Sequence, residues 1–453
     1  MNEPSFHTFP GVSSKQWKQK IQFELQGDDY NRNLIWKSPE GIDVKPFYHP
    51  DDFTAPVNKT ENVGSVKGCF EIQVQNAFKA NKKIRQLANT KIESIYLIIH
   101  NKQIDIEILF ADIDPEKTEY HIEMKFLSVN YIEKLQNFTV QNKIIAYLHV
   151  DIIGNLTHNG NWHFNLEKDF GILHKIVNSP LQFKSVISVN TLQYHNAGAN
   201  MVQQLAYAMA HANEYLNFIN NSDLLQNPSK AENSENFSFS FKIATGSNFF
   251  FEIAKIKALR ILWKTLSNHY NLKSDCHIIA FPSYRYQTLL KNNLNKTRNS
   301  TSCLIAFLGG ADTVCNVPHD VFYKKGSTAS ENEAINTIIE LKNRKMQSLC
   351  GSFYIETITE QLAQKALQLF KQIEKGGGFL NQLKNHTIQK KIKESAEIEQ
   401  REFNENYLTF YKSSGIVDKI DIDSFLKKVS RKTIIQPVIQ KRLSEDYEKL
   451  QIH

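Results

Sequence analysis

The sequence lacks the features that assign a chain to a membrane or to the secretory pathway. No apolar run reaches the roughly 18 residues that suggest a membrane-spanning helix. The N-terminus, MNEPSFHTFPGVSSKQW, has no basic region followed by an apolar stretch, so it does not indicate a secretory signal. We therefore expect a cytoplasmic protein with no membrane partner.

Cysteine is also scarce, and none of it forms a CxxC pair. The five cysteines are Cys69, Cys276, Cys303, Cys315 and Cys350. An odd, scattered set in a long chain predicts reduced and mostly buried thiols rather than disulfides. A catalytic thiol is the alternative, and no recognisable Cys/His setting favours it.

Short motifs of known chemistry are missing as well, because there is no GxxxxGK[ST] phosphate loop, HExxH zinc helix or GxSxG nucleophile elbow. The net charge of +7 is spread thinly along the chain. Its densest basic run is Lys427–Lys432, followed by Lys441 and Arg442, without the interleaved aromatic residues of a nucleic-acid groove. We expect a solvated face or a subunit contact there, with nucleic-acid binding as a minor alternative.

The stretch Ser185–Trp263 contains two consecutive units of a strand, a turn and a long helix. In the first unit, the β-branched run Val186–Val189 precedes apolar residues at helical spacing over Met201–Ile219. In the second unit, phenylalanine and serine alternate over Phe237–Phe241, and helical spacing resumes over Phe249–Trp263. Two such units imply parallel strands joined by crossover helices.

The same alternation continues along the chain and predicts an α/β fold, a (β/α)8 TIM barrel. The expected strands are Ser94–His100, Tyr120–Leu127, Lys143–Ile153, Ser185–Leu192, Phe237–Ala244, Cys276–Pro282, Ala311–Cys315 and one near Cys350–Ile355. Further helices are expected from about Tyr286 to Gly309, over Glu331–Met346 and Ile358–Glu374, and over about Asn385–Asn404. Eight strands alternating with helices favour a closed barrel over an open sheet.

We expect three parts: an extended N-terminal arm (1–50), the barrel (51–404) and a short C-terminal helical tail (405–453). The arm holds Trp36, Ile42, Val44, Phe47 and Tyr48 among prolines that favour extended backbone. Such a segment cannot bury itself, so it lies either on a partner subunit or on its own barrel. The tail is too short and polar for a second α/β domain.

Several long motifs resemble the methylmalonyl-CoA mutase family, specifically its small (beta) subunits. They are WKQKIQFELQGDDYNRNLIWKSPEGIDVKPFY, YHNAGANMVQQLAYAMAHANEYL, NFFFEIAKIKALRILW, LGGADTVCNVPHD, GSFYIETITEQLAQKALQLFKQIEKGGGF and IQKKIKESAEIEQREF. The resemblance covers most of the chain, more weakly between about Asp51 and Pro180. It implies a heterodimer with a large (alpha) subunit, which holds adenosylcobalamin and isomerises methylmalonyl-CoA to succinyl-CoA in propionate metabolism.

The family keeps its cofactor on a C-terminal flavodoxin-like domain, through the histidine of a DxHxxG motif. The nearest string here is QYHNAG, Gln193–Gly198, with Gln193 at the aspartate position and the whole string inside the barrel motif. We interpret this match as coincidence. We therefore expect no cobalamin-binding flavodoxin-like domain in this chain and no cofactor of its own.

The catalytic subunits of the family also carry a Tyr-His pair shortly before Glu-Ala-Gly-Ala. Anchoring on Ala197–Ala199 places that pair at Leu192 and Gln193. Leucine has no hydroxyl group, and glutamine cannot act as an imidazolium. Tyr194 and His195 stand two residues too late, so we expect His195 to be a hydrogen-bonded turn or interface histidine. The family's Val-Arg-Asn-Thr and Thr-Arg-Gly-Pro-Tyr substrate segments are not found either.

The sequence thus predicts a non-catalytic small subunit with no catalytic, cofactor-binding or metal-binding residues. The rival hypothesis is a free-standing barrel enzyme, or a CoA-ester binder, with a new site at the C-terminal rim of the barrel. Asp151 and Asp312, near the ends of expected strands, are its candidate acid/base residues. Neither has an identifiable partner in the sequence, so we expect each to be structural.

Overall fold

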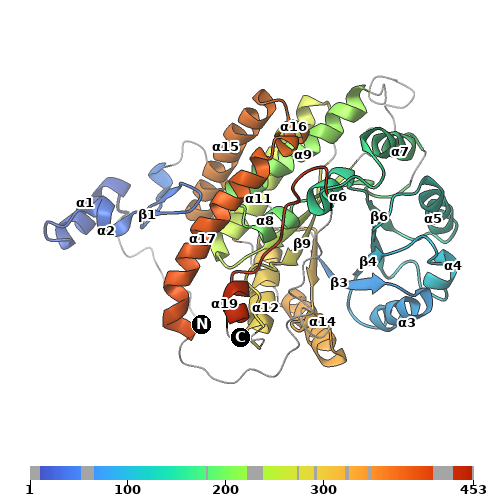
Figure 1. Cartoon of the computed structure of the whole chain (residues 1–453). Helices are drawn as coiled ribbons and strands as arrows, with labels where there is room; N and C mark the ends of the chain where they lie inside the picture. Colours follow the sequence, from blue (N-terminus) through green and yellow to red (C-terminus); the bar gives the residue numbers. More distant parts are fainter. Residues whose placement is uncertain are drawn as a thin grey trace.

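The computed structural model describes residues 11–52, 66–179, 182–221, 238–272, 275–289, 293–321, 326–344, 349, 351–411 and 432–450. A barrel of parallel strands surrounded by helices forms the body of the molecule, and the N-terminal helices project to one side of it (Figure 1). Within these ranges, none of the helices combines the length and the apolar character that crossing a lipid bilayer requires.

Eight parallel strands form the barrel wall, which confirms the predicted (β/α)8 fold. They are β3 (Lys67–Val74), β4 (Ser94–Ile99), β5 (Glu119–Met124), β6 (Ala146–His149), β7 (Ile187–Asn190), β8 (Phe239–Thr245), β9 (His277–Pro282) and β10 (Thr313–Asn316). The hydrogen-bonded order is β6-β5-β4-β3-β10-β9-β8-β7, and a parallel bridge between Val150 and Ile187 joins its two ends. The carboxyl ends of the strands therefore share one rim.

Helices surround this wall. They are α3 (Ala77–Ala88), α4 (Ile106–Leu109), α5 (Val129–Gln141), α6 (Ile152–Asn159), α7 (Leu166–Asn178), α8 (Leu192–Ala197), α9 (Met201–Asn221), α11 (Phe249–His269), α12 (Asn293–Leu308) and α14 (Thr328–Asn343), followed by α15 (Phe353–Lys375), α16 (Phe379–Lys384), α17 (Thr387–Tyr411) and α19 (Glu445–Leu450). The helix expected from about Tyr286 begins later, at Asn293. α15 packs along α9 and α11, so it belongs to the outer layer of the barrel.

One predicted strand is wrong, and one real strand is absent from the prediction. Of the strand expected near Cys350–Ile355, residues 353–355 form the start of α15, Gly351 and Ser352 precede that helix, and Cys350 lies outside the described residues. Its apolar residues belong to a helical face, because Ile355 and Ile358 are both buried at a spacing of three. The unpredicted strand is β3, which pairs with β4 and β10 and so joins the first part of the barrel to the last.

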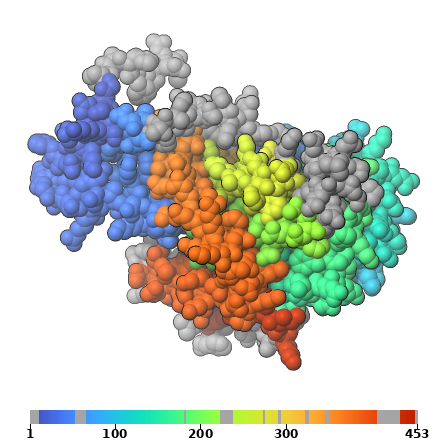
Figure 2. Space-filling model, turned by 90° about the horizontal axis from the view of Figure 1, so that it is seen from above, coloured from blue at the N-terminus to red at the C-terminus, as the bar shows by residue number. Residues whose placement is uncertain are grey.

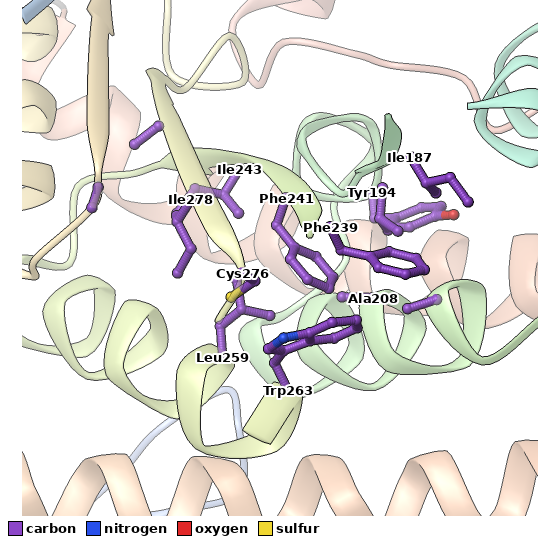
Figure 3. Packing of buried hydrophobic residues seen from close by; sticks show 14 of the residues in the cluster. Ile187, Tyr194, Ala208, Phe239, Phe241, Ile243, Leu259, Trp263, Cys276 and Ile278 are labelled. Atoms are coloured by element: carbon purple, nitrogen blue, oxygen red, sulfur yellow. The ribbon is translucent and has the colours of Figure 1, made fainter. Parts of the chain in front are cut away.

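The core between wall and helices is well illustrated by β8 and α11. Phe239 and Phe241 extend from β8 toward Trp263 of α11, with ring centroids 4.8 and 5.3 Å from the Trp263 ring (Figure 3). Such aromatic pairs contribute about 0.5–1.5 kcal/mol each beyond their buried area. Side chains alternate along a strand, so Ser240 and Lys242 point the other way, into the barrel.

The cysteines of the described residues agree with the predicted reduced, buried thiols. Cys69, Cys276, Cys303 and Cys315 are buried and free, while Cys350 lies outside the described residues. Burial raises the pKa of the Cys276 thiol to about 12, and nearby Asp312 and Asp275 add to the effect although Arg260 opposes it. A buried thiol that resists ionisation is a poor nucleophile.

The N-terminal arm lies partly on the barrel and partly away from it. It comprises α1 (Ser14–Glu24), α2 (Tyr30–Leu34), the antiparallel strands β1 (Trp36–Lys37) and β2 (Asp43–Val44), and the short helix η2 (Pro50–Asp52). Ile42 is 1% exposed and Val44 is 8% exposed, and both join the main core. By contrast, Trp17 is 48% exposed and Phe23 is 79% exposed on α1, in the blue lobe at the left of Figure 2. The alternative of packing on its own barrel therefore applies to Ile42 and Val44, but not to α1.

The last described residues, 432–450, run back across the C-terminal rim of the barrel. The Val438 amide donates to the carbonyl of Thr157 in α6, the helix that follows β6, at 2.7 Å. Arg442 is 3% exposed, and its Nη2 lies 2.6 Å from Glu448 Oε2. The expected solvated basic face is therefore wrong for Arg442, while residues 427–431 of the basic run lie outside the described part.

Candidate functional site

A cavity of about 320 Å³ opens at the C-terminal rim of the barrel. Five neighbouring strands each contribute a polar side chain to it: Tyr96 from β4, Glu123 from β5, His149 from β6, Asn190 from β7 and Lys242 from β8. Active sites of (β/α)8 proteins lie at this face, because the loops and strand ends converge there. We call this cavity the barrel-mouth cavity.

A charged cluster forms the floor of the barrel-mouth cavity. Lys242 Nζ lies 3.0 Å from Glu123 Oε2, and the Tyr96 hydroxyl donates to the same oxygen at 2.7 Å. The second carboxylate oxygen of Glu123 accepts from Lys125 Nζ. Lys242 is 8% exposed, and its ammonium group also lies 4.6 Å from the ring centroid of Tyr96 and 4.7 Å from that of Phe281. These aromatic faces offset part of the cost of burying the charge.

The charges of this cluster follow from its contacts. Burial by itself would raise the pKa of the Glu123 carboxyl, but the charges of Lys242 and Lys125 and hydrogen bonds from Lys125 and Tyr96 hold that pKa well below its ordinary value. Burial raises the pKa of Tyr96 well above its usual value, and the charge of Glu123 reinforces the effect. Two ammonium groups therefore share one carboxylate beside a neutral phenol.

Two histidines adjoin the cluster inside the barrel. His121 Nδ1 and His149 Nε2 lie 3.1 Å apart, and both rings are within 6.0 Å of the Tyr96 ring between centroids. Burial lowers the pKa of His149 to about 3 and that of His121 well below its ordinary value, so both rings are neutral at pH 7. Within the described residues, His149 Nδ1 has no hydrogen-bond partner although the residue lines the barrel-mouth cavity.

The sequence-based reasoning did not identify Tyr96, Glu123, His149 or Lys242. A signal for them is nevertheless present, because charged and imidazole side chains interrupt otherwise apolar strands in HIEM and FSFSFKIA. Charged residues are rarely buried unless they are paired. Glu123 and Lys242 within two buried strands therefore indicate a pair inside the barrel.

Asp151 lines the same cavity, but its carboxylate is fully occupied. It follows β6 and caps α6 by accepting from the Gly154 amide at 2.7 Å. It also accepts from the Asn190 amide at 2.8 Å and from the Tyr215 hydroxyl at 2.8 Å, and His211 Nε2 lies 2.9 Å from its Oδ1. Asp151 thus has partners that the sequence did not reveal, and they give it a structural role in holding the rim together.

Asp312 lies at the other end of the barrel. It precedes β10, where it pairs with Arg260 at 2.9 Å and accepts from the Ile278 amide at 2.6 Å. This position is at the amino ends of the strands, away from the barrel-mouth cavity. Asp312 therefore cannot share a reaction with Asp151.

The residues that follow β7 are divided between cavity and core. Leu192 lines the barrel-mouth cavity with an apolar side chain, whereas Gln193 is fully buried and donates its amide to Thr157 Oγ1. Tyr194 is also fully buried, with its hydroxyl 3.0 Å from His211 Nδ1. None of these side chains offers a free hydroxyl or imidazole to the cavity.

His195 is hydrogen-bonded as expected, but it lies on the helix α8 rather than in a turn. Its Nε2 lies 2.7 Å from Ser283 Oγ, and the residue is 4% exposed. Burial lowers its pKa well below the ordinary value, and the charges of Lys255 and Arg285 lower it further. His195 does not fit a cobalt ligand, because its ring is enclosed by protein. Across the described ranges, no group of three histidine, cysteine or acidic residues is arranged to hold a metal ion.

Comparisons with known proteins place this barrel in a family. Residues 98–411 match the family model described as Methylmalonyl-CoA mutase. A methylmalonyl-CoA mutase small subunit from Porphyromonas gingivalis is 27% identical over 87% of this chain and 68% of its own length. A methylmalonyl-CoA mutase from Cereibacter sphaeroides is 25% identical over 84% of this chain and 61% of its own length. A methylmalonyl-CoA mutase small subunit from Propionibacterium freudenreichii subsp. shermanii is 26% identical over 82% of this chain and 63% of its own length. Because the family model matches well over half of its residues, the chain belongs to the methylmalonyl-CoA mutase family.

Proposed function

We propose that this chain is the non-catalytic small subunit of a heterodimeric, adenosylcobalamin-dependent methylmalonyl-CoA mutase in the cytoplasm. The large subunit carries out the isomerisation of methylmalonyl-CoA to succinyl-CoA, and this chain has a structural role in assembly. The small-subunit names of two relatives support a large-subunit partner.

The observation that carries the proposal is the state of Leu192 and Gln193. The resemblance assigns a tyrosine and a histidine to these positions in catalytic subunits. Here Leu192 presents only an apolar side chain to the cavity, and the Gln193 amide is buried against Thr157. A hydroxyl and an imidazole are thus replaced by groups that cannot perform their proton chemistry.

The exposed aromatic residues of α1 support a partner contact. α1 has no buried residues, and Trp17 and Phe23 are 48% and 79% exposed. Large exposed apolar groups on a helix that has no buried residues are consistent with a contact to another chain. Fully burying one such side chain contributes on the order of 1.5–3 kcal/mol, so two of them supply a useful part of a binding free energy.

His195, the histidine in the nearest match to the family's cobalt-binding motif, is enclosed by protein and does not fit a cobalt ligand, so we propose that the large subunit holds the cofactor that supplies the radical chemistry. Purification of the protein from its native cells tests the assignment. We expect a roughly equimolar larger subunit that contains a DxHxxG motif, and no saturable binding of adenosylcobalamin to the isolated chain. Micromolar binding of adenosylcobalamin by this chain at unit stoichiometry would overturn the proposal.

The second candidate is a free-standing barrel enzyme or CoA-ester binder. The barrel-mouth cavity favours it, because Glu123, Lys242 and Tyr96 converge at the rim where barrel enzymes place their sites. This alternative predicts an active homo-oligomer and turnover of a CoA ester by the isolated chain. The subunit proposal predicts turnover only when the large subunit is present.

A further inference from the structure

We propose that the barrel-mouth cavity binds a small oxyanion, a carboxylate or inorganic phosphate, through the ammonium groups of Lys242 and Lys125. This inference goes beyond the subunit role, because neither the large subunit nor the cofactor takes part in it. The volume of the barrel-mouth cavity, about 320 Å³, lies at the lower end of the roughly 300–1,000 Å³ typical of small-molecule sites.

The N–H donors of Lys125 and Lys242 outnumber the acceptor oxygens recorded for them. Each lysine ammonium group has three N–H donors. Within the described residues, the acceptor recorded for both Lys125 Nζ and Lys242 Nζ is the single carboxylate of Glu123. Both lysines line the cavity, so a ligand with acceptor oxygens would complete their hydrogen bonding. Charge-assisted bonds of this kind are about twice as strong as neutral ones.

In the part of the chain that the structure describes, the other carboxylates near the cluster are not recorded as hydrogen-bond acceptors of the two lysines. Asp151 already accepts hydrogen bonds from the Gly154 and Asn190 amides and the Tyr215 hydroxyl, and it also lies 2.9 Å from His211 Nε2. Glu71 does not line the cavity, and burial raises the pKa of its carboxyl, although Lys242 opposes this effect. Glu123 is therefore the carboxylate recorded as an acceptor of both lysines, although Asp151 also faces the open volume.

His149 adds a polar nitrogen without a recorded partner in the described part of the chain to the lining of the cavity. His149 is 4% exposed and lines the cavity, and its Nδ1 lacks a hydrogen-bond partner within the described residues. A buried polar atom without a partner is costly and indicates an unseen ligand or water. Lys242 and His149 both contact the Tyr96 ring and both line the cavity, so the ammonium group and the unpartnered nitrogen belong to one part of its wall.

The test is calorimetric titration of the full chain at low ionic strength with sodium acetate, sodium phosphate and acetamide. Acetamide matches acetate in shape but has no charge. We expect saturable binding of acetate or phosphate at unit stoichiometry, with a dissociation constant of about 1 mM, and no binding of acetamide. The probe that saturates identifies carboxylate or phosphate as the ligand class. Equal binding of acetate and acetamide, or no saturation with either anion, would refute the inference.

Variants connect the binding to the named lysines. Lys242→Met should weaken the affinity for the anion by at least about tenfold. Lys117→Met, at an exposed lysine outside the cavity, should leave the affinity unchanged. If Lys242→Met fails to fold, Lys125→Met serves instead, because that side chain is 48% exposed. Glu123→Gln removes the competing carboxylate and should preserve or tighten anion binding. Anion binding that survives both lysine changes, or is lost in Glu123→Gln while the fold is intact, would contradict the proposal.

Discussion

His211 Nε2 lies 2.9 Å from Asp151 Oδ1, with the histidine fully buried and the aspartate side chain 12% exposed. Since His211 Nδ1 also lies 3.0 Å from the Tyr194 hydroxyl, this contact links the loop after β6 to α8 and α9. The carboxylate thereby fixes the helices of the rim, and the barrel-mouth cavity depends on it for its shape.

Replacing Asp151 by asparagine should destabilise the protein strongly at pH 7. Burial alone would raise the pKa of Asp151, but the charge of His211 and hydrogen bonds from His211, Tyr215 and Asn190 lower it. Breaking a buried pair by removing one partner costs about 3–5 kcal/mol in the free energy of unfolding. Urea unfolding measures this difference, and Asp112→Asn is the control, because the Asp112 side chain is 77% exposed.

The sign of the pH dependence provides a second check on Asp151. Because the folded pKa is depressed, the stabilisation by the carboxylate is present above the unfolded pKa of about 3.9 and is lost as the pH falls through the folded value. The difference in the free energy of unfolding between the parent and Asp151→Asn should therefore shrink as the pH is lowered. A change no larger than that of Asp112→Asn at pH 7 would show that the buried contacts of Asp151 do not stabilise the fold.

The buried neutral histidines should make the fold sensitive to mild acid. Burial lowers the pKa of His277 to about 4 and that of His149 to about 3, whereas an unfolded histidine titrates near about 6.5. As the pH falls below about 6.5, the unfolded state binds more protons than the folded state. Each such histidine then removes about 1.4 kcal/mol of stability per pH unit until its folded pKa is reached.

Denaturant unfolding at several pH values measures this slope. His277→Gln retains an amide that can hydrogen-bond to Thr313, the present partner of His277 Nε2 at 3.0 Å. Between pH 6.5 and 4.5, we expect the free energy of unfolding of this variant to fall less steeply with pH than that of the parent. The difference in slope should correspond to about one proton taken up on unfolding. If the free energies of unfolding of the two proteins fall with the same slope against pH, His277 takes up its proton in the folded state as readily as in the unfolded state.

If the chain assembles with a large subunit as proposed, His195→Ala should leave the turnover of that complex within a few-fold of the parent value. The reason is that His195 is enclosed and bonded to Ser283, so it does not reach the cavity. Steady-state assays of the complex, with assembly checked by size-exclusion chromatography, measure this effect. A loss of about 100-fold with assembly intact corresponds to about 2.7 kcal/mol of transition-state stabilisation and would make His195 a functional residue.

Restoring the family's pair with Leu192→Tyr and Gln193→His should create no mutase activity in the isolated chain. The Gln193 side chain is buried against Thr157, so a histidine placed there faces the core rather than the cavity. Assay of the purified double variant with methylmalonyl-CoA and adenosylcobalamin measures the outcome. The parent chain is the control, and activity above it would show that these two positions alone had silenced the site.

The two parts of the arm should respond differently to substitution. Trp17→Ser with Phe23→Ser should weaken binding to the large subunit without changing the stability of the isolated chain, since both side chains are exposed. Ile42→Ala should instead destabilise the isolated chain by about 2–5 kcal/mol, because Ile42 is part of the main core. Size-exclusion chromatography and urea unfolding separate the two effects. Unchanged partner binding in the double variant would remove α1 from the interface.

Seven of the eight barrel strands were predictable because their apolar runs are bounded by turns and by amphipathic helices. β3 was missed because its sequence, KGCFEIQV, places the polar residues Glu71 and Gln73 on the interior face of the barrel. The false strand arose because a run as short as Phe353–Ile355 has no distinguishable period, and its helical identity depends on burial against α9 and α11.

The candidate site was less predictable than the fold, for a physical reason. Glu123 and Lys242 are 119 residues apart in the chain, and only closure of the barrel brings them together. The contacts of Asp151 with His211 and Tyr215 likewise span 60 residues or more and leave no local pattern. Local spacing therefore identifies the strands but not the side chains that meet between them.

The pairing of β3 with β10 has a consequence for the synthesis of the chain. Cys69 of β3 lies opposite Cys315 of β10 in the sheet. One edge of β3 therefore has no strand partner until the ribosome has made nearly all of the barrel. At roughly 5–20 residues per second, the intervening segment takes about 12–50 s to translate. During that time, the nascent half-barrel carries an open strand edge, which is a template for pairing with other chains. A chaperone that shields this edge co-translationally would raise the yield of closed barrels.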